Sequence, residues 1–99
     1  RRQDIARVAT RVGLTIVEDD AYGFLFDGQQ PLCAVVPERT FYLTSMSKSL
    51  APGLRVGLLR TPPGWTERVT GAIFATTVMA TPFDTAAVCT AIEDGTAAG

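Results

Sequence analysis

The feature that most constrains the fold is a short apolar run at residues 14–17, Leu-Thr-Ile-Val, in which polar and apolar side chains do not alternate cleanly. A run of this length and pattern is typical of a strand buried on both faces, as in a parallel sheet. Residues 40–44 and 56–59 are two further candidate strands. The third candidate follows the second too closely for a helical crossover, so we expect it to be antiparallel to the second or not to lie beside it.

Helical segments precede and follow these runs. Residues 1–12 carry apolar side chains at helical spacing, and Gly13 supplies a stop. A second helix is expected to begin near Gly64, and an Ala-rich helix is expected from Pro82 to Asp94. Helices mixed with short strands in this order indicate the α/β fold class. With 99 residues and no internal repeat or linker, the chain is expected to be one small domain or part of a larger one.

Charge and composition narrow the possible functions. The nine basic and ten acidic residues give a net charge of −1, so we expect no nucleic acid to bind through this segment. No apolar run is long enough to cross a bilayer, and we expect no membrane partner. The absence of His excludes zinc sites built on His and Ser-His nucleophile pairs. Cys33 and Cys89 form no C-x-x-C motif, so we expect buried, reduced thiols and a cytoplasmic protein.

Two polar clusters follow the first two candidate strands. Glu18, Asp19 and Asp20 come after the first strand, and residues 45–48 come directly after the second. In α/β sheets, ligands bind beyond the carboxyl ends of the strands. The two clusters are therefore candidates for one shared site.

Lys48 is the one residue in the chain that could form an imine. A lysine in a partly desolvated pocket has a lowered pKa and can attack a carbonyl. The alternative is a surface lysine in a serine-rich loop. All eight other basic residues are arginines, which form no Schiff base, so any imine chemistry depends on Lys48.

Three residues near Lys48 suit a phosphate group. The hydroxyls of Ser45 and Ser47 and the guanidinium of Arg55 could converge on one, although an ordinary turn with a surface arginine explains the same residues. The segment is not a Walker A loop, because no G-x-x-x-x-G precedes the lysine.

Two residues after the first strand have both a possible site role and a plainer structural one. The Asp19 carboxylate could hold a protonated ring nitrogen, and the Tyr22 phenol could bond an oxygen on the same ring. A turn carboxylate and a half-buried packing residue are the alternatives. Asp20 is expected to hydrogen-bond to the loop backbone.

Taken together, these motifs resemble a known family. Residues 17–23, V-E-D-D-A-Y-G, and residues 42–57, Y-L-T-S-M-S-K-S-L-A-P-G-L-R-V-G, contain D-x-x-Y and S-x-S-K-x-x-x-P-G-x-R-x-G. This pattern resembles the class I/II aminotransferases, fold-type-I enzymes that depend on pyridoxal 5′-phosphate (PLP), over essentially the whole chain. Residues 91–96 are similar to the aminotransferase-like domain of MocR-type regulators of the GntR family, which is fused to a winged helix-turn-helix.

The resemblance implies PLP as cofactor and a role for each site residue. Lys48 would form the internal aldimine and act as general acid and base. Asp19 would keep the pyridinium nitrogen protonated, and Tyr22 would hydrogen-bond the 3′-oxygen. The phosphate would be held by Ser45, Ser47 and Arg55. The catalytic residues would thus be Lys48, Asp19 and Tyr22, with no metal.

The resemblance also implies a domain and its partners. Residues 1–99 would form part of the mostly parallel large, PLP-binding domain, which in the family is several times longer. The ring-stacking aromatic residue, the Asn beside the 3′-oxygen and the substrate-binding Arg lie outside this chain. Three functions remain open: an aminotransferase acting on an amino acid and a 2-oxo acid, a PLP-binding effector domain of a regulator that contacts DNA through a fused domain, and an inactive truncated fragment. The full-length protein is expected to be a homodimer.

Overall fold

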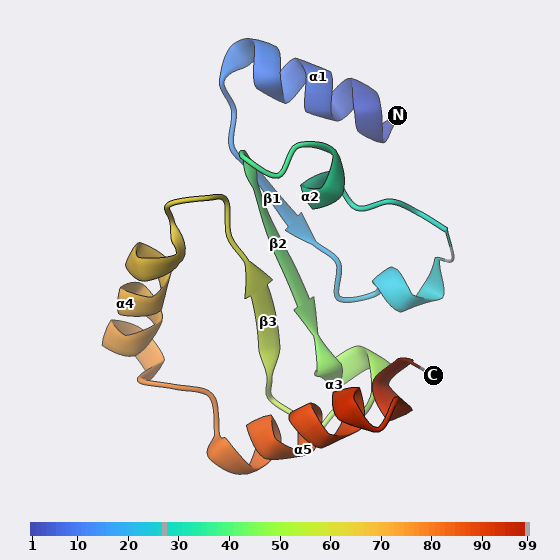
Figure 1. Ribbon diagram of the computed structural model, residues 1–99, viewed down its shortest axis with the longest axis vertical. Coiled ribbons are helices and arrows are strands. Elements are labelled where there is room, and N and C mark those ends of the chain that lie inside the picture. The colour runs from blue at the N-terminus through green and yellow to red at the C-terminus, as the bar shows by residue number, and fades with distance from the viewer. Residues whose placement is uncertain (27, 99) are drawn as a thin grey trace.

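A three-stranded sheet forms the centre of the molecule. The computed structural model describes residues 1–26 and 28–98. The strands are β1 (Ile16–Asp19), β2 (Thr40–Ser45) and β3 (Gly57–Arg60), arranged in the order β1-β2-β3 (Figure 1). β1 is parallel to β2, whereas β3 is antiparallel to it. The sheet confirms the α/β fold class and the antiparallel direction expected for the third strand.

The first strand begins later than its hydrophobic pattern predicts. Pairing with β2 starts at Ile16, opposite Thr40, and continues to Asp19, opposite Leu43. The apolar Leu14 precedes the strand and is exposed, because the chain is still leaving the helix that ends at Val12. As a consequence, two of the three carboxylates predicted to follow the strand lie within it.

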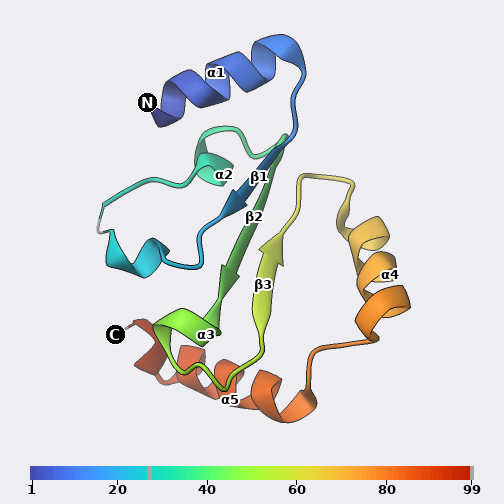
Figure 2. The same cartoon turned by 180° about the vertical axis from the view of Figure 1, so that it is seen from behind.

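Helices lie around the sheet on three sides. They are α1 (Arg2–Val12), α2 (Leu32–Val35), α3 (Met46–Ser49), α4 (Thr66–Thr77) and α5 (Pro82–Glu93), with short 3₁₀ turns at Gly23–Leu25 and Thr96–Ala98. α1 lies near the amino ends of β1 and β2, and α5 lies near α3 at the opposite end of the sheet (Figures 1 and 2). The predicted site residues lie at the end of the sheet that faces α3 and α5.

The small core is formed where α1 and α2 meet β1. Ala6, Leu32 and Val36 are buried there, and Ile16 packs against them. α1 ends because Gly13 adopts the left-handed conformation, φ 72°, which lets its amide bond the carbonyl oxygen of Ala9. This stop turns the chain from the helix into β1.

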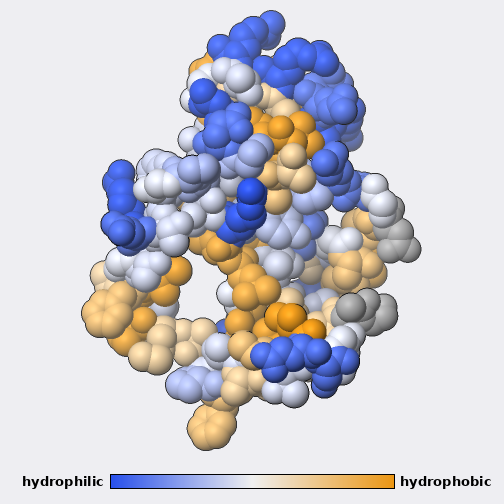
Figure 3. Space-filling view, in the orientation of Figure 1, coloured by the Kyte–Doolittle hydropathy of each residue, from blue (hydrophilic) through white to orange (hydrophobic). Residues whose placement is uncertain are grey.

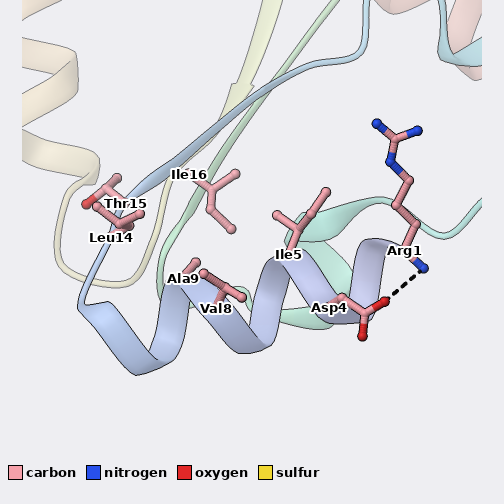
Figure 4. Close-up of a pocket in the computed structure, with 8 residues that line it drawn as sticks. All are labelled: Arg1, Asp4, Ile5, Val8, Ala9, Leu14, Thr15 and Ile16. Carbon is pink, nitrogen blue, oxygen red and sulfur yellow. Dashed lines mark ion pairs between the residues drawn. The ribbon is translucent and has the colours of Figure 1, made fainter.

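Much apolar surface lies outside this core. α4 buries none of its residues, and Figure 3 shows apolar side chains around the opening between β3 and α4. A second apolar surface lines a cavity of about 390 Å³ beside α1 (Figure 4). Its lining comes from α1 and the segment that leads into β1: Arg1, Asp4, Ile5, Val8, Ala9, Leu14, Thr15 and Ile16. Both surfaces lie away from the carboxyl ends of β1 and β2.

Two expectations from composition can be compared with the structure. Over the part of the chain that is described, every helix is too short or too polar to pass through a bilayer. Both cysteines are free, and Cys33 is buried as expected, but Cys89 is exposed on α5. The expectation that both thiols are buried is therefore wrong for Cys89, because α5 buries only Val88 and Ala91.

Candidate functional site

Three chain segments meet at one edge of the sheet. Because β1 and β2 are parallel, the residues that follow both strands lie at the same edge, and the antiparallel β3 begins there. The amide of Asp20 bonds the carbonyl of Leu43 at 2.8 Å, and the amide of Met46 bonds the carbonyl of Val56 at 3.2 Å. The structure thus brings together the segments that carry Asp19, Lys48 and Arg55.

Lys48 and Tyr22 lie side by side at this edge. Lys48 is in α3, directly after β2, and its Nζ atom is 5.7 Å from the centroid of the Tyr22 ring. This distance allows a cation–π interaction between the ammonium group and the ring. Both side chains are exposed, so the described residues supply no desolvated pocket around the amine.

Asp19 combines a turn role with an accessible carboxylate. Its Oδ1 atom accepts a hydrogen bond from the amide of Ala21 at 3.1 Å, which is the turn role that the sequence left open. Among residues 1–26 and 28–98, no hydrogen bond to its Oδ2 atom is found. Asp19 also lines a cavity of about 610 Å³, whose other lining residues are Arg1, Arg2, Ile5, Glu18, Gln29 and Leu32.

The three predicted phosphate-binding side chains differ in what they can still donate. The Ser45 hydroxyl accepts from the amide of Ser47 at 3.1 Å, as the N-cap of α3, and keeps its own proton. The Ser47 hydroxyl donates its single proton to the carbonyl of Leu54 at 2.6 Å. Arg55 is exposed. In this arrangement Ser45 and Arg55 can donate to an anion, whereas Ser47 would first have to release Leu54.

Asp84 is a site residue that our sequence reasoning missed. Its Oδ2 atom accepts a hydrogen bond from the amide of Arg55 at 3.3 Å and so ties α5 to the segment before β3. Hydrogen bonds from the Thr81 side chain and the Arg55 amide lower the pKa of the Asp84 carboxyl. The pattern T-x-x-D at the start of a helix was available as a capping signal. It does not reveal the contact with Arg55.

Glu18 belongs to the structure of the sheet and not to the edge. Its carboxylate is buried, forms an ion pair with Arg2 and accepts hydrogen bonds from the amides of Leu32 and Cys33 at 3.0 and 3.2 Å. The sequence placed it with Asp19 and Asp20 in one cluster. Neighbouring residues in a strand point to opposite faces, so the Glu18 carboxylate is buried and the Asp19 carboxylate is exposed, although both residues line the cavity of about 610 Å³.

Asp20 was expected to bond the loop backbone with its side chain, and the structure corrects this expectation. The Asp20 Oδ2 atom accepts a hydrogen bond from the hydroxyl of Tyr42 at 2.7 Å. The carbonyl of Asp20 makes the bond to the loop, from the amide of Gly23 at 3.0 Å. The reason is the register, which places Tyr42 in β2 within reach of the residue that follows β1.

The hydrogen-bonded phenol of Tyr42 is expected to make the protein lose stability at alkaline pH. Burial and the hydrogen bond to Asp20 raise the pKa of Tyr42 from 10.0 to about 12. The folded protein therefore holds this proton where the unfolded chain releases it, and the stabilisation is complete below pH 10 and disappears as the pH rises to about 12. We expect wild type to lose more stability over this range than Tyr42→Phe does, in thermal unfolding of the whole protein. Parallel curves for the two proteins would contradict this expectation.

Comparisons with known proteins show what this chain is similar to. The HTH-type transcriptional regulator YisV of Bacillus subtilis, itself uncharacterized, is 40% identical over 73 residues, which are 70% of this chain and 15% of the regulator. An uncharacterized aminotransferase of Saccharolobus solfataricus is 45% identical over 60 residues, 57% of this chain and 15% of that protein. Aromatic-amino-acid aminotransferase 1 of Thermococcus litoralis is 36% identical over 73 residues, 70% of this chain and 18% of the enzyme. No family model matches the chain.

A solved structure shares the fold. The crystal structure of a PLP-dependent aminotransferase from Streptococcus suis superimposes with a TM-score of 0.83 over 97% of this chain and 26% of that one, at 22% sequence identity. The fold is that of part of a PLP-dependent aminotransferase. The relatives of this chain include both aminotransferases and HTH-type regulators, and the chain is similar to a part of each. It spans less than a fifth of the length of the curated relatives that it matches.

Proposed function

We propose that the whole protein binds PLP through Lys48 and transfers amino groups between an amino acid and a 2-oxo acid. The observation that carries this proposal is the position of the Lys48 amine. It lies against the Tyr22 ring, at the edge where the segments of Asp19 and Arg55 also meet. A lysine amine can form an imine with an aldehyde, and the position of Lys48 beside Tyr22 supports this role.

The donors and acceptors at this edge fit the three chemical parts of PLP. The Lys48 amine suits the aldehyde, and the accessible Asp19 carboxylate suits a protonated ring nitrogen. The Ser45 hydroxyl and the Arg55 guanidinium suit the phosphate, the first as a neutral donor and the second as a charged, forked one. Tyr22 adds a phenol beside the amine, as a donor for the 3′-oxygen.

The chain's own residues would have distinct tasks. PLP, when bound, acts as an electron acceptor for chemistry at the α-carbon of an amino acid. Asp19 would keep the proton on the ring nitrogen by pairing with it, and Tyr22 would orient the ring. Lys48 is the group placed to take a proton from the substrate carbon and return it elsewhere, because its amine moves on a flexible stem. Ser45 and Arg55 would anchor the phosphate and so fix the distance between the ring and the amine.

The test uses the whole protein reconstituted with PLP. Uptake of the cofactor should produce a visible absorption band, and borohydride should then attach the cofactor permanently to the tryptic peptide that contains Lys48. An amino acid without a 2-oxo acid should convert the bound cofactor once, and a 2-oxo acid should restore it. Label on another lysine of the whole protein would contradict the assignment of Lys48, and binding without any conversion would contradict the transfer activity.

Relatives that are HTH-type regulators support a second candidate function. In this case the same PLP site would sense an amino acid or its adduct, and a DNA-binding domain elsewhere in the protein would read out its state. The net charge of −1 argues against DNA contact through the present segment. DNA binding that changes with PLP or an amino acid, without catalytic turnover, would favour the regulator. Size-exclusion chromatography with light scattering would test the proposed homodimer.

A further inference from the structure

Asp20 stands between two proposed cofactor-binding residues and is held by hydrogen bonds to both its backbone and its side chain. It follows Asp19 directly and precedes Tyr22 by two positions. Its amide bonds the carbonyl of Leu43 at 2.8 Å. Its own carbonyl accepts from the amide of Gly23 at 3.0 Å and from the hydroxyl of Thr44 at 3.3 Å. The backbone on both sides of Asp20 is thus tied to β2 and to the following turn.

The side chain of Asp20 adds a third connection. Its Oδ2 atom accepts the 2.7 Å hydrogen bond from the hydroxyl of Tyr42. Tyr42 lies in the middle of β2, paired with both β1 and β3, so it is a fixed point of the sheet. A hydrogen bond to a charged acceptor is stronger than one between neutral groups. The Asp20 carboxylate therefore attaches the turn to the sheet.

Gly23 shows that this carboxylate has a defined place. A Cβ atom added at Gly23 would lie 2.2 Å from Oδ2 of Asp20 and 2.5 Å from its Cγ atom. Real Cβ atoms essentially never approach other atoms so closely, so with any other residue at position 23 the Asp20 carboxylate or the turn would have to shift. The turn after β1 is thus built around this carboxylate.

We propose that Asp20, held by Tyr42 and accommodated by Gly23, is a positioning residue that directs Asp19 and Tyr22 toward the cofactor. Asp20 itself does not contact the cofactor in this proposal. The proposal rests on the proposed function. The Asp20 carboxylate fixes the turn. The side chains of Asp19 and Tyr22 emerge on either side of this turn. Loss of its hydrogen bond would let both side chains leave the positions that suit the ring.

The experiment compares four variants of the whole protein: Asp20→Ala, Asp20→Asn, Tyr42→Phe and the double variant Asp20→Ala/Tyr42→Phe. The PLP dissociation constant and the pH midpoint of the visible band of bound PLP are measured for each. Asp20→Ala and Tyr42→Phe should each raise the dissociation constant about five- to tenfold and shift the midpoint, since each removes the same hydrogen bond. The double variant should be no worse than Asp20→Ala, and Asp20→Asn should recover most of the affinity because its amide oxygen still accepts from Tyr42.

Two further variants separate positioning from general destabilisation. Asp4→Asn makes the same chemical change on the exposed face of α1 and should leave both readouts unchanged. Gly23→Ala should impair PLP binding in wild type but much less in the Asp20→Ala background, where the clashing carboxylate is absent. A smaller effect of Gly23→Ala in the Asp20→Ala background is specific to the contact between position 23 and the Asp20 carboxylate. A general loss of stability would not produce it.

The outcomes distinguish failure of PLP binding from failure of the positioning role of Asp20. If wild type takes up no PLP, the proposed function fails, and this inference fails with it. If wild type binds PLP but Tyr42→Phe and Asp20→Ala lower only the thermal midpoint of the apo protein, the proposed function stands and Asp20 is merely structural. Additive effects of Asp20→Ala and Tyr42→Phe on the dissociation constant would also overturn the inference.

Discussion

Asp19→Ala in the whole protein is expected to retain PLP but to slow proton abstraction from the amino acid by about 100- to 1000-fold, the usual range for loss of one preorganised electrostatic partner. The physical reason is that the proposed carboxylate keeps a positive charge on the ring nitrogen, which makes the ring a better electron acceptor. Stopped-flow spectroscopy of the half-reaction with a single amino acid measures this step directly.

The affinity of Asp19→Ala for PLP provides the internal control. Lys48, Ser45 and Arg55 would still hold the aldehyde and the phosphate, so the dissociation constant should change far less than the rate. Asp19→Asn should behave like Asp19→Ala, because an amide cannot carry the negative charge. An unchanged half-reaction in both variants would remove the proposed electrostatic role from Asp19.

Glu18→Ala should produce the largest loss of stability in this part of the protein. The buried carboxylate forms an ion pair with Arg2 and accepts from the amides of Leu32 and Cys33, so its removal leaves three donors without their partner. Breaking a buried pair from one side costs about 3–5 kcal/mol. The Arg2 side chain is 37% exposed and can reach water, so we expect Glu18→Ala to lower the free energy of unfolding by about 3 kcal/mol.

Two further variants are compared with Glu18→Ala for their loss of stability. Glu18→Gln keeps one acceptor oxygen for α2 and should cost less than Glu18→Ala, although its ion pair is lost. Asp4→Asn breaks an exposed pair, in which Arg7 and Asp4 have exposed fractions of 74% and 64%, and should change stability by less than about 0.5 kcal/mol. Urea unfolding of the apo protein gives all three values. Equal losses for Glu18→Ala and Asp4→Asn would mean that the buried network contributes little.

The strands, the helices α1, α4 and α5, and their order could be predicted from the sequence, but the short helices α2 and α3 and the roles of adjacent carboxylates could not. Apolar periodicity and glycine stops indicate where helices and strands lie. The short connection before the third strand left two arrangements open, and the structure shows the antiparallel one. The register of a strand decides which face each side chain occupies, and β1 begins two residues after the predicted start. That shift placed Glu18 inside the strand, against α2, and left Asp19 at its end.

Contacts between segments that are distant in the sequence also could not be predicted. Asp84 and Arg55 are 29 positions apart, and their hydrogen bond depends on how α5 lies against the start of β3. Ser47 shows the same limit over a shorter distance, because its bond to the carbonyl of Leu54 follows from the path of the chain between β2 and β3. Residue types and spacing suggested a phosphate site, which stays a prediction, and they could not show which hydroxyl keeps its proton.

The connection between β2 and β3 has a practical consequence. It carries Lys48 near one end and Arg55 near the other, and both are trypsin cleavage points on exposed side chains. Attachment of a cofactor to the lysine would block one cleavage point, and a phosphate held by the arginine would shield the second. Digestion of this single stretch, followed by mass spectrometry, would therefore report the loaded fraction of a preparation even when its colour is too weak to measure.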